Sequence, residues 1–188
     1  MIRAMDDVTA FQRASDGFMA RAQRIQDDQW TASTPCTEWD VRALTNHVAV
    51  EYLWVPEMLA GHTIADVGDR FDGDVLGDKP LEALTEAQRK AVSATQEPGA
   101  TSRTVHLSFG DMSGAEYIRQ MAIDSTIHSW DLARGIGGDD RLDPELVDYA
   151  YADLQKTAED WRSAGAFGPE QDAADAGVQA KLLALTGR

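Results

Sequence analysis

Amphipathic helical periodicity runs through most of this chain and limits its fold more than any other feature. In the segment 114–134, Ile118, Met121 and Leu132 recur at the spacing of one helix face. Similar apolar stripes predict further helices over residues 7–25, 41–61, 81–96, 144–163 and 179–187. Only residues 104–109 alternate between apolar and polar side chains, as a strand does. These patterns predict an all-α fold with one short extended segment.

Capping and helix-breaking residues mark where these helices should begin and end. Thr37-Glu-Trp-Asp40 has the form of a capping box with Asp in place of Glu, which predicts that the second helix begins after Thr37. Pro56 lies inside that helix and should kink it or end it about one turn early. Residues 62–80 and 165–177 are rich in Gly and Asp, which predicts irregular loops.

Length and charge limit the class of protein and its partners. A chain of 188 residues with 43% apolar residues suits a single domain spanning residues 1–188. The chain has 17 Lys and Arg against 32 Asp and Glu, and its formal net charge of −15 repels nucleic acid and anionic membranes. Cys36 is the only cysteine, so no intrachain disulfide can form. Because no signal-like or membrane-length apolar segment is present either, we expect a cytoplasmic protein.

An acid and an imidazole lie four residues apart in the helix predicted over residues 114–134. At about 100° per residue, Asp124 and His128 leave the same helix face one turn apart. Burying either group without a partner costs several kcal/mol, and a divalent cation would satisfy both. A solvated ion pair or a hydrogen-bonded histidine would also fit this pair, since the motif is short.

A third candidate ligand, His47, lies on the second predicted helix. Together with Asp124 and His128 it forms a set of two imidazoles and one carboxylate, which suits zinc and other borderline divalent metals such as nickel. Glu51 lies one turn after His47 and could be a fourth ligand or orient His47, although a solvated position on the rim is the expectation. Asp131 could accept the second ring N–H of His128 or remain a solvated or Arg-paired carboxylate.

Three strings in the chain resemble those of a known family. They are Thr34-Pro-Cys-Thr-Glu-Trp-Asp-Val-Arg-Ala-Leu-Thr-Asn-His47, Phe71-Asp-Gly-Asp-Val-Leu-Gly-Asp78 and Ile127-His-Ser-Trp-Asp-Leu-Ala-Arg134. The strings are similar to those of actinobacterial metal-binding proteins related to the N-terminal domain of mycothiol-dependent maleylpyruvate isomerase, within the DinB-like superfamily. The resemblance extends from about residue 5 to the end of the sequence.

The resemblance implies a DinB-like four-helix bundle with an up-up-down-down arrangement and extra short helices. It also implies a divalent metal, usually zinc, bound by His47, Asp124 and His128. Asp124 departs from the characterised isomerase, which has Glu at this position, so the shorter side chain must approach the ion more closely or bind it through one oxygen. The resemblance does not by itself carry isomerase activity over, because that enzyme has a separate C-terminal domain that helps to hold substrate. Relatives in the superfamily are often homodimers, so a homodimer is possible here, and the sequence leaves the oligomeric state open.

The resemblance favours a transferase or isomerase in which the metal activates mycothiol or another low-molecular-weight thiol toward a small electrophile. A non-catalytic, dimeric metal-binding protein and a hydrolase that uses metal-bound water remain alternatives. Trp39 and Trp130 are interpreted as packing residues, and Cys36 as a small buried residue. Arg42 and Arg134 are hypothesised to steer an anionic thiol or substrate.

Overall fold

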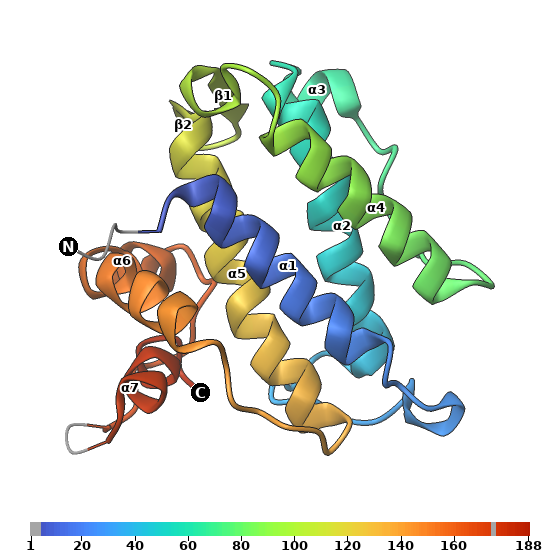
Figure 1. Cartoon of the computed structure of the whole chain (residues 1–188), viewed down its shortest axis with the longest axis vertical. Helices are drawn as coiled ribbons and strands as arrows, with labels where there is room; N and C mark the ends of the chain where they lie inside the picture. The colour runs from blue at the N-terminus through green and yellow to red at the C-terminus, as the bar shows by residue number, and fades with distance from the viewer. Residues whose placement is uncertain (1–4, 174–175) are drawn as a thin grey trace.

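Four long helices form the frame of the molecule and lie side by side in Figure 1. The structure is a computed structural model that describes residues 5–173 and 176–188. The four helices are α1 (Asp7–Ala22), α2 (Val41–Leu59), α4 (Pro80–Thr95) and α5 (Gly114–Gly135). Helix α1 packs mainly on α5, and α2 packs mainly on α4. The predicted all-α, DinB-like helical bundle is therefore confirmed.

The remaining elements are short or lie outside the four-helix frame. They are the 3-10 helices η1 (Asp27–Gln29) and η2 (Ala100–Ser102), the helices α3 (Ile64–Val67), α6 (Pro144–Ser163) and α7 (Val178–Leu185), and the strands β1 (Thr104–Leu107) and β2 (Gly110–Ser113). The two strands pair antiparallel, with Thr104 opposite Ser113. The extended segment predicted over residues 104–109 therefore turns back on itself as a hairpin, whose second strand the sequence pattern did not reveal.

The directions of the four helices differ from the expected up-up-down-down order. Asp7 at the start of α1 is bonded to Arg119 near the start of α5, so these two helices run parallel. Gly135 at the end of α5 lies against Val41 at the start of α2, so α2 is antiparallel to α5. Helices α2 and α4 run in the same direction (Figure 1). The order along the chain is therefore up, down, down, up, and α2 faces α5 as an antiparallel neighbour.

Two helix boundaries correct the predictions from the sequence. Asp40, rather than Thr37, caps α2, because its carboxylate accepts the backbone N–H of Ala43. In the turn before this cap, the Thr34 hydroxyl accepts the backbone N–H of Cys36 and donates to the carbonyl oxygens of Cys36 and Trp39. Pro56 does not end α2 early, since the helix continues to Leu59. Within the loop expected over residues 62–80, four residues form α3 under a capping box from Thr63.

Two apolar clusters meet at α5 and place the candidate site between them. The larger cluster fills the four-helix bundle and includes the fully buried Phe11, Leu44 and Tyr52. The smaller cluster joins the outer face of α5 to α6 and α7, and includes Ile127 and Leu154. Helix α5 is buried on both sides, so its polar residues require partners inside the protein. Among the described residues, no helix combines the length and the apolar character needed to cross a bilayer.

Candidate metal centre

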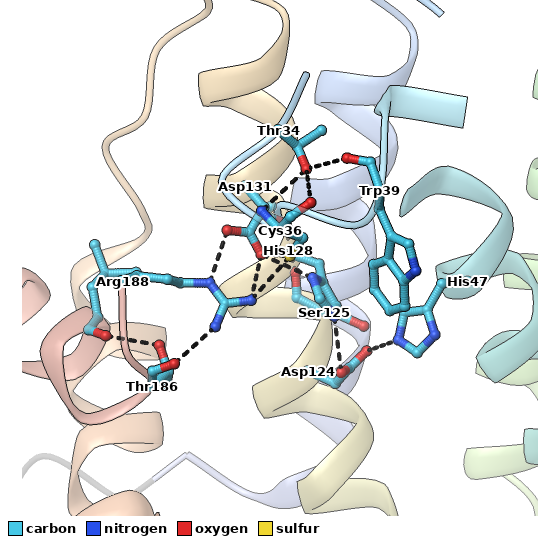
Figure 2. A network of polar contacts seen from close by, with 12 residues as sticks. Thr34, Cys36, Trp39, His47, Asp124, Ser125, His128, Asp131, Thr186 and Arg188 are labelled. Carbon is cyan, nitrogen blue, oxygen red and sulfur yellow. Dashed lines mark hydrogen bonds and ion pairs between the residues drawn. The ribbon is translucent and has the colours of Figure 1, made fainter. Parts of the chain in front are cut away.

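The antiparallel packing of α2 against α5 brings His47 opposite Asp124 and His128. Figure 2 shows the three side chains converging from the two helices. The Nε2 atom of His47 lies 3.7 Å from Oδ2 of Asp124, and Nε2 of His128 lies 3.3 Å from Oδ1 of Asp124. One donor atom from each residue falls within 4.8 Å of the others. The structure thus brings the three expected ligands together, and metal binding by them stays a prediction.

The second ring nitrogen of His128 is held by a buried carboxylate. Nδ1 of His128 lies 2.9 Å from Oδ2 of Asp131, whose side chain is completely buried. Arg188 forms a bidentate pair with the same carboxylate, through Nε at 2.8 Å and Nη2 at 2.7 Å. Asp131 therefore has both of the partners that the sequence left open, a histidine and an arginine. With Nδ1 engaged, Nε2 of His128 is the nitrogen presented to Asp124.

Electrostatics in this cluster favour charged carboxylates and a basic imidazole. Burial acts to raise the pKa of Asp124, but the two imidazoles outweigh it and hold the pKa well below its usual value. Burial acts to lower the pKa of His128, and the carboxylates of Asp124 and Asp131 outweigh it, so that pKa is raised. The pKa of Asp131 is lowered because its bonds to His128 and Arg188 overcome its burial. The imidazole of His128 therefore lies between two carboxylates that both favour its protonated form.

Cys36 belongs to this cluster, which the sequence did not indicate. Its Sγ lies 3.2 Å from Oδ2 of Asp131 and 3.3 Å from Nη2 of Arg188, and the residue is only partly buried. The interpretation of Cys36 as a buried small residue is therefore wrong. Donor atoms of Cys36, His128 and Asp131 also lie within 4.8 Å of one another. The guanidinium of Arg188 already contacts both Cys36 and Asp131, so an arginine, rather than a metal ion, provides the positive charge for this second donor group.

Trp39 and Glu51 border the three expected ligands on the α2 side. The indole of Trp39 lies over the His47 ring with 4.5 Å between centroids and 30° between planes, and covers one face of it. Glu51, one turn after His47, is partly buried and faces the cleft, so the expected solvated rim position is wrong. Burial, followed by the charge of Asp124, raises the pKa of Glu51 to about 7. Glu51 is not part of the close donor group.

The expected ligands lie in a cleft of about 840 Å³ that also involves residues far along the chain. Its walls come from α2, α5, α6 and three segments outside these helices, residues 35–39, 165–168 and 186–188. Arg188 carried no signal in the sequence, because only the packing of α7 brings it to α5. Arg42 and Arg134 do not line the cleft: Arg42 pairs with Asp74, and Arg134 pairs with Asp140. The hypothesis that these two arginines steer a ligand into the cleft has no support in this geometry.

Comparison with known proteins identifies the family. Residues 11–133 match the family model described as the mycothiol maleylpyruvate isomerase N-terminal domain. Two relatives from two strains of Mycobacterium tuberculosis, both described as uncharacterized, are each 32% identical over 147 residues, covering 76% of this chain and 74% of theirs. No solved structure shows a significant match to the chain. The matched range includes all three expected ligands, and the chain belongs to the mycothiol maleylpyruvate isomerase N-terminal domain family.

Proposed function

We propose that this protein binds a divalent metal ion, most simply zinc, through His47, Asp124 and His128, and uses it in a mycothiol-dependent transferase or isomerase reaction. The observation that carries the metal assignment is the convergence of these side chains from two helices at a cleft. The family match is what favours mycothiol over other thiols.

The donor set fits a tetrahedral ion. With metal–ligand bonds of about 2.0–2.1 Å, neighbouring ligand atoms in a tetrahedral site lie roughly 3.4 Å apart. The Nε2 atom of His128 lies 3.3 Å from Oδ1 of Asp124, and Nε2 of His47 lies 3.7 Å from the other carboxylate oxygen, Oδ2. One donor atom from each of the three residues lies within 4.8 Å of the others, close to the spacing that such an ion needs. Two imidazoles with one carboxylate form a set that zinc accepts, and nickel or another transition metal remains an alternative.

The surrounding residues are arranged to support such a centre. Asp131 fixes the orientation of His128 and makes Nε2 the available donor. Trp39 covers one face of the His47 ring and helps to hold its orientation. With three protein ligands, a bound ion would offer an open position at which a thiol or a water loses its proton near neutral pH. Glu51 faces the same cleft, and its pKa of about 7 suits a group that accepts that proton.

The proposal is tested by titrating the metal-free protein with cobalt and then with mycothiol. We expect one cobalt ion per chain with a visible spectrum typical of low coordination number, and a new sulfur-to-cobalt charge-transfer band when the thiol is added. His128→Ala should abolish the visible spectrum. His106→Ala is the matched control, because His106 lies on the hairpin and pairs with Asp111 away from the cleft.

Two other functions predict different results in the same experiment. A non-catalytic metal-binding protein would give the cobalt spectrum without a change on addition of thiol. A metal-dependent hydrolase would turn over an ester substrate with metal alone and without thiol. Loss of thiol-dependent turnover of a model electrophile in His128→Ala, with wild-type activity in His106→Ala, supports the transferase. Equal cobalt binding by wild type and His128→Ala contradicts the metal site.

A further inference from the structure

We propose that the cleft selects uncharged, apolar electrophiles and disfavours dicarboxylates. This inference concerns the same site and rests on the proposed function. Beyond the expected ligands, the cleft wall formed by α5, α6 and the 165–168 segment is mostly apolar, with Gln120 and Asp153 as its polar side chains. Its apolar side chains are Met121, Ile123, Ile127, Leu154, Trp161 and Phe167. Such a wall suits an aromatic or alkyl group placed next to the metal position.

Positive charge for an anionic ligand is missing from this cleft. Of the described residues that line it, Arg188 is the only Lys or Arg. Its Nε and Nη2 are committed to Asp131, its Nη1 lies 3.3 Å from the carbonyl of Thr186, and its side chain is only 13% exposed. Because the buried Asp131 carboxylate already balances this guanidinium, Arg188 has no charge left for a ligand.

Negative charge, in contrast, remains in the cleft. Glu38 and Asp153 line it, and the nearest cation to Asp153 is Nη1 of Arg119 at 3.7 Å. Arg119 is shared, since it also holds Asp7. A divalent ion bound with the Asp124 carboxylate would leave one net positive charge, enough to balance a single ligand carboxylate.

A second ligand carboxylate would have no cationic partner and would lie among acids. Maleylpyruvate, the compound in the family description, carries two carboxylates at neutral pH. The cleft of this chain therefore suits an uncharged electrophile better than maleylpyruvate. The expected reaction is a substitution or an addition. In a substitution on a chloro-aromatic compound, the thiolate sulfur forms the new C–S bond, chloride leaves, and the thiol proton passes to solvent.

Ligand binding can be measured without any thiol. Dimethyl phthalate and phthalate differ in charge but share one aromatic frame, and Trp39 and Trp161 in the cleft report binding through their fluorescence. With zinc-loaded protein we expect the diester to bind at least tenfold more tightly than the dianion.

A charge placed in the cleft should reverse this preference. Gln120 lines the cleft one turn before Asp124, so Gln120→Arg supplies the missing cation. This variant should bind phthalate at least tenfold more tightly than wild type. Gln155→Arg adds the same charge at an exposed position of α6 that does not line the cleft, and should leave phthalate binding unchanged.

Two outcomes overturn the inference. One is phthalate binding to wild type as tightly as its diester, and the other is a Gln120→Arg protein that binds phthalate no better than Gln155→Arg. Failure of the proposed function appears elsewhere, as an unchanged cobalt spectrum with mycothiol or no thiol-dependent turnover. The binding comparison of phthalate with its diester is still decisive in that case.

Discussion

Replacing Arg188 tests whether the α7 segment stabilises the candidate metal centre. Arg188→Gln removes a bidentate partner from Asp131, a carboxylate with no exposed side-chain surface. Breaking a buried ion pair by removing one partner costs about 3–5 kcal/mol. The lower end, about 3 kcal/mol, applies because His128 still bonds Asp131 and a glutamine can replace one hydrogen bond. For a chain of this size, that loss lowers Tm by roughly 6–12 °C.

The assay is thermal and urea unfolding of the metal-free protein at neutral pH. Arg141→Gln is the matched control. Arg141 pairs with Asp139 but is 85% exposed, so its loss should leave the free energy of unfolding almost unchanged. Adding Asp131→Asn to Arg188→Gln removes the orphaned buried charge while keeping an acceptor for His128. The double variant should therefore be more stable than Arg188→Gln alone.

Equal Tm values for Arg188→Gln and Arg141→Gln would refute this reasoning. So would a double variant whose losses simply add, because then the charge of Asp131 would not be the cause. Arg162→Gln separates a local effect from general loosening of the C-terminal segment. Arg162 bonds the carbonyls of Gly168 and Leu185 but does not contact Asp131, so the second substitution Asp131→Asn should not rescue it.

Three further predictions follow from individual residues. Gly114→Ala should destabilise the protein by several kcal/mol in urea unfolding, since an added Cβ would lie 2.0 Å from the Ala100 carbonyl oxygen. Gly17→Ala should instead stabilise α1 by about 0.5–1 kcal/mol, because its Cβ would meet nothing closer than 3.7 Å. A Gly114→Ala protein as stable as wild type would contradict that close approach. The pKa of Glu51 is raised to about 7, so the folded metal-free protein loses stability as the pH rises from about 4.5 to 7. After allowance for the partial exposure of Glu51, Glu51→Gln should raise the free energy of unfolding by about 1–3 kcal/mol at pH 8 and leave it unchanged at pH 4. A gain of the same size at both pH values would exclude ionisation of Glu51 as the cause. Because Asp124 and Asp131 raise the pKa of His128, zinc must displace a proton from this imidazole. Calorimetry in buffers of different ionisation enthalpy should therefore show release of about one proton near pH 7, and zinc should bind more weakly at lower pH. Zinc affinity independent of pH would rule out His128 as a ligand.

The spacing of residues along the chain was enough to predict the helices and which residues share a helix face. The helical stripe of α5 and the four-residue step from Asp124 to His128 place both side chains on one face, because an α-helix repeats every 3.6 residues. Most helices could be predicted in the same way to within a few residues. The errors at Thr37 and over residues 62–80 arose where a short turn, rather than a long repeat, decides the backbone.

The ionic environment of the candidate centre was set by contacts between residues distant in sequence. Cys36 and Arg188 are 152 positions apart, yet both contact Asp131. Nothing periodic links them, because their meeting depends on how α7 packs against α6 and how the 35–39 turn folds over α5. For the same reason, the partial burial of Glu51 and the pairing of Arg42 with Asp74 could not be derived from charge alone.

By itself, the sequence determined an all-α bundle and the three residues His47, Asp124 and His128 as candidate ligands, since helix geometry and donor chemistry depend only on residue type and spacing. The tertiary structure decided the helix directions, the bond from Asp131 to His128 and the commitment of Arg188 to that acid. Burial and charge pairing arise only when separate helices pack together, and they control both the basicity of His128 and the ligand charge that the cleft can accept.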